Sequence, residues 1–384
     1  MRLEFSNNII MLHKYNSFLY NTFWLDKENK LKTFIKWPGG KERELPIIRK
    51  FIPEYKGRYI EPFVGGGAVF FDIDNKKCLL NDKSKELIDL YTFIKKRSPS
   101  FLKLFNKLIN EFESLNVFAD RYSENILDLY HSKIGIDVFI SKFSSQFDHI
   151  AEINHSIFEK ELEKNLKSKI ARSNALEEKQ GKISNEDKID NIEAALKSAY
   201  YMYVRNLYNG QTLSDESKKA ALFFFIREYC YSSMFRYNSK GEFNVPYGGI
   251  SYNRKDIKKK YEYILSDAMR QKLKNCELYN YDFEEFLNMV KPKRDDFIFL
   301  DPPYDSDFST YAKNSFDKEE QIRLRNYLTN TKAKILLVIK NTEFIYNLYK
   351  DDFKISDFDK KYMVSFMNRN DKDVKHLVVT NYTI

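Results

Sequence analysis

FIFLDPPY, residues 297–304, is an apolar run that ends in an acid, two prolines and an aromatic ring. The apolar half predicts a buried strand. Because the prolines fix φ and cannot continue a ladder of hydrogen bonds, the strand should stop in a stiff turn. Open α/β sheets bind their ligands outside the carboxyl ends of their strands. The stretch therefore indicates an α/β fold with a ligand-binding corner at Asp301. A rigid loop with a surface tyrosine would have the same sequence pattern.

Expected strands and helices alternate along the chain on both sides of this corner. Strands are expected at 58–61, 78–81 and 334–339, and helices begin near Ala68 and at Ser84. A succession of strand, turn, helix and strand predicts a parallel sheet. Two further β-rich runs, at 363–367 and 376–383, are expected to form an antiparallel pair at the edge of that sheet.

A long charged segment splits this α/β pattern into two parts. Residues 97–221 are rich in Lys and Glu, in runs typical of solvated helix faces. After them, Lys240-Gly241 within 236–246 predicts a hairpin, and a helix is expected at 256–274. We therefore expect an extension over residues 1–32, a main domain formed by 33–96 and 270–384, and an inserted domain over 97–269.

The composition narrows the class of partner. A formal net charge of +9 favours a polyanion such as nucleic acid. The cysteines Cys78, Cys230 and Cys276 lie far apart and form no CxxC pair, and the five histidines show no metal-ligand spacing, so we expect neither a disulfide framework nor a metal site. The sequence shows no signal-peptide pattern and no apolar run of about 20 residues, which predicts a cytoplasmic protein without a membrane partner.

A glycine turn, EPFVGGG at residues 61–67, lies between an expected strand and an expected helix. Glycines at such a turn let the backbone approach a nucleotide-like ligand. The turn lacks the Gly-Lys-Ser/Thr ending of a phosphate loop, so ATP or GTP is not expected. Asp82 ends the next strand, near the offset at which an acid binds ribose hydroxyls in dinucleotide folds. Asp82 or Ser84 would also suit the cap of the following helix.

KWPGGK, residues 36–41, places one of the two tryptophans beside a tight turn and a lysine. Trp37 could pack only as a plug in that turn. Near a carboxylate-bearing ligand, Lys41 and the amides of the turn would instead bind the carboxylate.

Five motifs follow one another along the chain: KWPGGK at 36–41, EPFVGGG at 61–67, Asn81-Asp82, the hairpin at 236–246 and DPPY at 301–304. In this order they resemble the Dam-like DNA adenine-N6 methyltransferases, the alpha group of the D12 class, over about residues 34–95 and 223–384. The resemblance implies a Rossmann-like, S-adenosylmethionine-dependent methyltransferase sheet. It also implies that 97–269 is a mainly helical target-recognition domain that carries a β-hairpin.

The resemblance assigns roles to individual residues. The cofactor-binding residues that it implies are Trp37, Gly39, Lys41, Phe63, Gly65, Gly67, Asp82, Asp282 and Asp301. Asp301 and the carbonyl of Pro302 would accept hydrogen bonds from the target amine, and Tyr304 would stack on a flipped base. The implied DNA contacts are Lys36, Tyr231, Met234, Arg236, Asn238, Pro246 and Tyr311.

Arg236 is the main candidate for reading a base, because arginine commonly contacts guanine O6 and N7. Alternatively, Arg236 and Lys240 contact only phosphate. The expected substrate is double-stranded DNA, methylated at a specific site by a monomer or weak dimer. The role is restriction–modification, with a cognate restriction endonuclease as partner, or a Dam-like one.

Other functions share some of these features. Cytosine-N4 methylation would need the same DPPY corner, and a non-catalytic DNA-binding regulator could have the same fold. The corner alone would also accept RNA or protein, but the hairpin favours duplex DNA. Because the long segment 97–221 departs from the smaller relatives, the DNA sequence that is recognised stays open.

Overall fold

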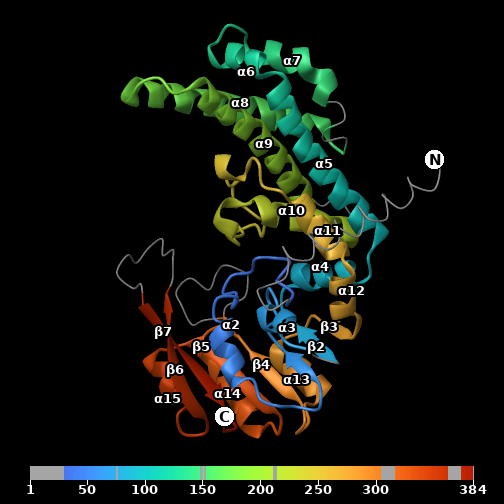
Figure 1. The fold of residues 1–384 in the computed structure, drawn as a ribbon, viewed down its shortest axis with the longest axis vertical. Helices are drawn as coiled ribbons and strands as arrows, with labels where there is room; N and C mark the ends of the chain where they lie inside the picture. The colour runs from blue at the N-terminus through green and yellow to red at the C-terminus, as the bar shows by residue number, and fades with distance from the viewer. Residues whose placement is uncertain are drawn as a thin grey trace, which may run out of the picture. The chain divides into compact units, whose positions relative to one another are not determined.

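The computed structural model describes residues 30–74, 77–147, 150, 153–210, 214–303, 316–361 and 373–383. The chain forms two compact units, one of Met1–Tyr91 with Tyr263–Ile384, and the other of Thr92–Glu262 (Figure 1). The strands predicted near DPPY and the glycine turn all belong to the first unit.

Within the described residues, the first unit contains a seven-stranded sheet of order β3-β2-β1-β4-β5-β7-β6. The strands are β1 Tyr59–Glu61, β2 Cys78–Asn81, β3 Cys276–Tyr279, β4 Phe297–Leu300, β5 Lys334–Lys340, β6 Lys354–Lys361 and β7 Asp373–Thr380. The first five run parallel, whereas β7 pairs antiparallel with both β5 and β6. This mostly parallel α/β sheet is consistent with the expected methyltransferase fold.

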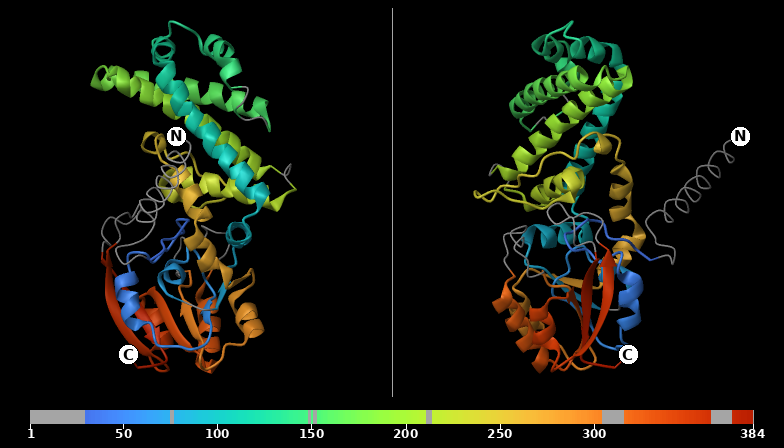
Figure 2. Two further views of the ribbon diagram at one scale, coloured as in Figure 1. Left: turned by 45° about the vertical axis from the view of Figure 1, so that its right-hand side comes forward. Right: turned by 90° about the vertical axis from the view of Figure 1, so that its left-hand side faces the viewer.

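Helices cover both faces of the sheet. The helices of the first unit are α2 Leu45–Ile48, α3 Ala68–Asp72, α4 from Lys85 to Lys95, α12 Asp267–Lys274, α13 Phe283–Val290, α14 Lys318–Asn330 and α15 Glu343–Tyr349. Side chains of α13, α14 and α15 form one hydrophobic core with alternate residues of the strands, including Ile60, Ile298 and Leu337. Figure 2 shows α2 on the opposite face of the sheet. Every residue of β1, β2 and β4 is buried, as expected for parallel strands covered on both faces.

The strands predicted at 78–81 and 297–300 are confirmed residue for residue, and those at 58–61 and 334–339 are confirmed to within one residue. Sequence reasoning missed β3 and β6. β3 is an edge strand whose side chains are half-buried or exposed, apart from Cys276. β6, KISDFDKK, is a polar strand at the other edge. Polar residues blunt exposed edges, and they also hide the strand pattern.

The structure bears on two further predictions. The antiparallel pair at the sheet edge is formed by β7 with β6, and the predicted strand at 363–367 lies outside the described residues. The single helix predicted over 256–274 is wrong, because the chain forms α11 Lys258–Leu265 and α12 Asp267–Lys274. Between them Ser266 leaves the helical conformation and accepts a hydrogen bond from the amide of Met269 at 3.2 Å, which makes it the N-cap of α12.

The second unit is helical. Its helices are α5 Pro99–Arg121, α6 Ser123–Tyr130, α7 Ile136–Phe147, α8 His155–Gln180, α9 Asn185–Asn209, α10 Glu216–Tyr229 and the start of α11, with short 3-10 turns at Tyr231–Ser233 and Ile250–Tyr252 (Figure 1). The prediction that 97–221 is helical is confirmed. The expectation of solvated faces holds for most of α8 but is wrong for α9, where even Glu193 and Lys197 are fully buried. Burial lowers the pKa of Lys197 to about 8, and its ammonium lies 4.0 Å from the ring centroid of Phe112.

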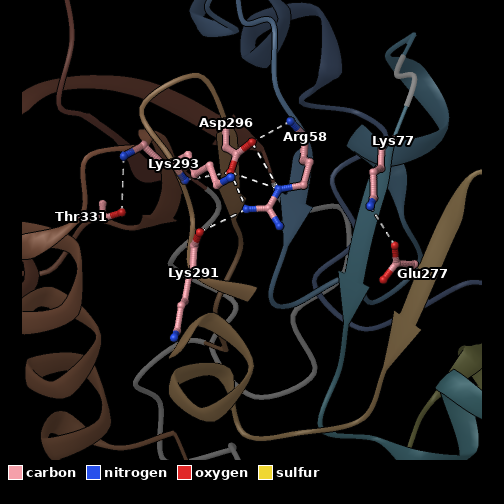
Figure 3. A network of polar contacts seen from close by, with 8 residues as sticks. Arg58, Lys77, Glu277, Lys291, Lys293, Asp296 and Thr331 are labelled. Atoms are coloured by element: carbon pink, nitrogen blue, oxygen red, sulfur yellow. Dashed lines mark hydrogen bonds and ion pairs between the residues drawn. The ribbon is translucent and has the colours of Figure 1, made fainter. Parts of the chain in front are cut away.

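Ion pairs connect neighbouring parallel strands at their amino ends (Figure 3). Arg58, just before β1, donates from its amide and guanidinium to Asp296, just before β4, with a closest guanidinium distance of 2.7 Å. The Lys293 amide also donates to Asp296, at 2.8 Å. Although burial alone would raise the pKa of Asp296, these hydrogen bonds lower it. Lys77 and Glu277 form a second pair at 3.1 Å between the ends of β2 and β3.

Candidate active site

The predicted cofactor residues meet at the carboxyl edge of the sheet. Because β1, β2, β3 and β4 are parallel neighbours, their carboxyl ends lie at one edge. The glycine turn follows β1, Asp82 follows β2, Asp282 comes three residues after β3, and Asp301 follows β4. The sheet order thus places the turn after β1 between acids that follow β2 and β4. This is the edge at which α/β proteins bind nucleotide-like ligands.

Lys41 and Asp301 form an ion pair at this edge. The Lys41 ammonium donates to Oδ1 of Asp301 and, at 2.9 Å, to the carbonyl of Gly39. Gly39 has a φ of +78°, which turns that carbonyl in the KWPGGK loop. The lysine side chain is only 2% exposed and the aspartate 18%, so little water competes for the pair. The Lys41 ammonium thus fixes the direction of the Asp301 carboxylate.

The glycine turn is shaped by Trp37 and Asp82. Gly65 and Gly67 have φ values of +48° and +73°, which a residue with a side chain adopts only with strain. A Cβ atom on Gly65 would lie 2.9 Å from Cδ1 of Trp37, and one on Gly67 would lie 2.6 Å from the hydroxyl of Tyr91. The turn therefore needs glycine at both positions. The packing alternative for Trp37 has support, since its ring sits against Gly65.

Asp82 accepts hydrogen bonds from the glycine turn and from Ser84, the residue before helix α4. Its Oδ2 accepts from the amide of Gly65 at 3.0 Å, and its Oδ1 accepts from the amide of Ser84 at 2.9 Å. The capping alternative is realised by Ser84, whose hydroxyl accepts a hydrogen bond from the amide of Leu87 in α4 at 3.4 Å. Burial raises the pKa of Asp82 to about 6, against the opposing effect of these two hydrogen bonds. Ribose binding by Asp82 stays a prediction.

Two buried residues of this edge had no predicted role. Asn81 donates to the carbonyls of Pro62 and Tyr281, each at 3.0 Å, and accepts from the amide of Tyr281 at 2.9 Å. It therefore ties the loops after β1 and β3 to the end of β2. Glu61 accepts from the hydroxyl of Tyr59 at 2.8 Å. Burial raises the pKa of Glu61 well above its ordinary value, and the nearby Asp301 raises it further. A polar residue at the end of a buried strand was the available signal for both.

Asp282 caps α13 and pairs with Arg323. Its Oδ1 accepts from the amide of Glu284 at 3.0 Å, and Nη2 of Arg323 donates to both carboxylate oxygens at 2.7 and 2.6 Å. The same guanidinium lies 4.5 Å from the ring centroid of Phe283. Phe63 packs against Phe283 with ring centroids 5.5 Å apart. The predicted contact of Asp282 with the cofactor would therefore use a carboxylate that already binds Arg323.

The corner after β4 is held by a residue that sequence reasoning missed. Pro302 is buried, whereas the carbonyl of Pro303 accepts a hydrogen bond from Nε2 of Gln321 at 3.2 Å. Gln321 itself is fully buried on α14. Tyr304 and Tyr311 lie outside the described residues. Lys36 is exposed at the start of the KWPGGK loop.

The predicted DNA-reading hairpin lies in the second unit. In the described residues it is a tight turn with one antiparallel bridge, Tyr237 to Phe243, rather than a pair of long strands. The guanidinium of exposed Arg236 donates through Nε to Oδ1 of Asn244 at 2.8 Å. Oδ1 of Asn238 accepts from the amides of Lys240 and Glu242 at 3.0 and 2.9 Å. Asn238 thus shapes the turn, and its predicted DNA contact stays a prediction.

The other predicted DNA contacts flank this hairpin. Tyr231 and Pro246 are exposed and joined by a hydrogen bond from the amide of Tyr231 to the carbonyl of Pro246, at 2.8 Å. The carbonyl of half-buried Met234 accepts from Arg227 at 2.5 Å. Arg227 is itself buried, and burial lowers its pKa. A buried arginine thus fixes the segment that leads into the hairpin, which sequence reasoning missed.

The described helices and acidic, histidine and cysteine side chains bear on a membrane and on a metal as partners. None of the helices among the described residues has the length and apolar character needed to span a membrane. Across the same residues, no group of three or more His, Cys, Asp or Glu side chains is placed to hold a metal ion. The predicted absence of a metal stays a prediction.

Comparison with known proteins identifies the family. The family model described as D12 class N6 adenine-specific DNA methyltransferase matches residues 37–182 and 173–364, which is most of the chain. The chain is 29% identical over 359 residues to the Type II methyltransferase M.CviBI of Paramecium bursaria Chlorella virus NC1A, covering 92% of this chain and 100% of the relative. It is 28% identical to the Type II methyltransferase M.MjaIII of Methanocaldococcus jannaschii, with the same coverage of both chains. It is 24% identical to the DNA adenine methylase of Serratia marcescens, over 84% of this chain and 88% of the relative. The chain therefore belongs to the D12 class of N6 adenine-specific DNA methyltransferases.

Proposed function

We propose that this enzyme methylates N6 of an adenine within a specific sequence of duplex DNA, at the carboxyl edge of the sheet. The observation that carries the proposal is the Lys41–Asp301 ion pair beside the glycine turn that Asp82 holds. The family implies S-adenosylmethionine as the methyl donor and DNA as the substrate.

The carboxyl edge fits such a cofactor. Gly65 and Gly67 expose backbone where side chains would collide with Trp37 and Tyr91, so a ligand can approach the turn closely. Asp82 offers a carboxylate to ribose hydroxyls, and Lys41 with the loop amides offers donors to a carboxylate. Bound S-adenosylmethionine would supply an electrophilic methyl group. The protein's contribution is to hold that group in line with the incoming amine, a proximity effect that can reach about 7–11 kcal/mol.

Asp301 and Pro302 act on the amine. The lone pair of adenine N6 is delocalised into the ring, which makes the nitrogen a poor nucleophile. When the Asp301 carboxylate and the Pro302 carbonyl accept hydrogen bonds from the amino group, they favour a pyramidal nitrogen whose lone pair points at the methyl carbon. Lys41 holds the Asp301 side chain in the orientation for this task. Pro302 and Pro303 hold the carbonyl direction stiffly.

The target adenine must leave the double helix to reach this corner. Extrusion costs a few kcal/mol, which stacking and hydrogen bonds in the pocket offset. Tyr304 is the proposed stacking residue. Arg236, on the hairpin, is the proposed reader of a base. The relatives are named Type II methyltransferases or DNA adenine methylases, so the role is restriction–modification with a cognate endonuclease, or a Dam-like one.

The test is product analysis on DNA treated with the purified protein and S-adenosylmethionine. Digestion to nucleosides and mass spectrometry should detect N6-methyladenine, and single-molecule sequencing should place it at one recurring sequence. Asp301→Ala serves as the inactive control. N4-methylcytosine as the product, or methylation of RNA but not of duplex DNA, would overturn the proposal.

A further inference from the structure

One face of α9 contacts the hairpin through three residues spaced four apart, Tyr201, Arg205 and Asn209. Residues at this spacing lie on one side of a helix. The amide side chain of Asn209 accepts from the Phe243 amide at 2.9 Å and donates to the Phe243 carbonyl at 3.0 Å. It therefore pairs with both peptide groups of Phe243, as a residue on a neighbouring strand would.

The next contact lies two residues further along the hairpin. The carbonyl of Val245 accepts from the hydroxyl of Tyr201 at 2.9 Å and from Nη1 of Arg205 at 3.1 Å. The side chains of Phe243 and Val245 are both fully buried. Two alternate residues of the segment 243–245 thus bind α9 through their backbone, and their side chains are buried.

Asn244, which lies between Phe243 and Val245, contacts Arg236, the residue predicted to read a DNA base. The amide of Asn244 donates to the carbonyl of Arg236 at 3.1 Å, and Oδ1 of Asn244 accepts from Nε of Arg236 at 2.8 Å. A shift of the segment 243–245 by one residue would turn Asn244 inward and break its hydrogen bonds with Arg236. The contacts of α9 at residues 243 and 245 therefore set the direction of the Arg236 guanidinium.

We propose that Asn209 and Arg205 are positioning residues for sequence recognition: they hold the hairpin in the register that points Arg236 at a base. This rests on the proposed function, in which the hairpin reads DNA. The proposal assigns a function to α9, which is part of the long helical segment 97–221. It also separates recognition from chemistry, because Asn209 lies on a helix of the second unit whereas Asp301 follows a strand of the first.

The chain offers a matched control on the same helix. The side chain of Asn206 donates to Oε1 of Glu161 at 3.3 Å, so it binds α8 and not the hairpin. Asn206→Ala and Asn209→Ala therefore remove the same kind of side chain from neighbouring turns of α9. Only the second change releases Phe243.

The experiment treats a random-sequence duplex library with each variant and reads methylated adenines by single-molecule sequencing. The measured quantity is the ratio of methylation at the preferred sequence to methylation at its one-base neighbours. For Asn209→Ala we expect this ratio to fall about tenfold or more, which is the scale of one lost bidentate base contact. The turnover number on saturating preferred DNA and the binding of S-adenosylmethionine should stay within about twofold of wild type. Asn206→Ala should keep the wild-type ratio.

A wild-type ratio in Asn209→Ala, or an equal fall in Asn206→Ala, would overturn the inference alone. If wild-type protein methylates no duplex DNA, the proposed function fails and the inference fails with it. Should Asn209→Ala not fold, Asn209→Asp keeps an acceptor for the Phe243 amide but loses the donor and places a negative charge beside the Phe243 carbonyl. Arg205→Lys probes the Val245 contact in the same way, and an unchanged ratio in both would refute the proposal.

Discussion

The two ends of strand β4 carry an aspartate each, and the two aspartates have different surroundings. Asp296, before the strand, accepts hydrogen bonds from the Arg58 amide, the Arg58 guanidinium and the Lys293 amide, and it is buried. Asp301, after the strand, is half-buried and pairs with Lys41 from a loop 260 positions away. At the amino end, backbone and side-chain contacts join β1 to β4. At the carboxyl end, Asp301 contacts a loop from a distant part of the chain. We infer that the first pair serves stability and the second serves chemistry.

The strongest test of this difference is Asp301→Ala. We expect methyl transfer to fall at least about 100–1000-fold, the usual effect of removing one oriented group that stabilises a transition state. The thermal unfolding temperature should fall as well, because the buried Lys41 ammonium loses its carboxylate partner, so turnover is measured well below the unfolding transition. Filter-binding of DNA should remain close to wild type. Near-normal turnover in this variant would contradict the assignment of Asp301.

Arg58→Ala at the amino end should lower the stability of the protein and leave its turnover unchanged. The change leaves buried Asp296 without its guanidinium partner, and we expect the free energy of unfolding to drop by about 2–3 kcal/mol. Denaturant unfolding measures this loss. Turnover measured well below the unfolding transition should match wild type. A large loss of turnover in the folded variant would show that the two ends of β4 are not separate in function.

Protonation of Asp82 should weaken cofactor binding in acid. Its pKa of about 6 means that the carboxylate becomes neutral as the pH falls through that value, so the acceptor for ribose hydroxyls is lost on the acid side. If only the anion binds, the apparent Kd for S-adenosylmethionine should rise about tenfold between pH 7 and pH 5. Isothermal calorimetry across this range measures the trend. Asp82→Asn should bind more weakly and show no such dependence on Asp82.

The smallest effect is expected from the exposed pair at the amino ends of β2 and β3. Lys77 and Glu277 lie 3.1 Å apart, but about half of each side chain is exposed. Lys77→Ala should change the free energy of unfolding by less than about 1 kcal/mol, because water and salt screen such pairs. A loss as large as that of Arg58→Ala would mean that exposure does not separate the two amino-end pairs.

Local patterns predicted most of the central sheet and missed its edges. The strands at 78–81 and 297–300 are fully buried and, apart from Asn81, apolar, so their sequence and their environment agree. β3 and β6 are edge strands with polar or half-exposed residues, and the break between α11 and α12 depends on one serine cap. Most of the predicted cofactor residues came from short motifs, whereas Gln321 and Arg323 stood in no motif. Their contacts depend on which loops and helices meet.

The sequence by itself determined the family, the glycine turn and the acid-proline corner after a buried strand, because each rests on neighbouring residues and their backbone preferences. Only the tertiary structure decided that Lys41 pairs with Asp301 and that Asn209 pairs with Phe243. Contacts between residues far apart in the chain depend on sheet order and helix packing. These are set by the burial of the whole core and have no local signal.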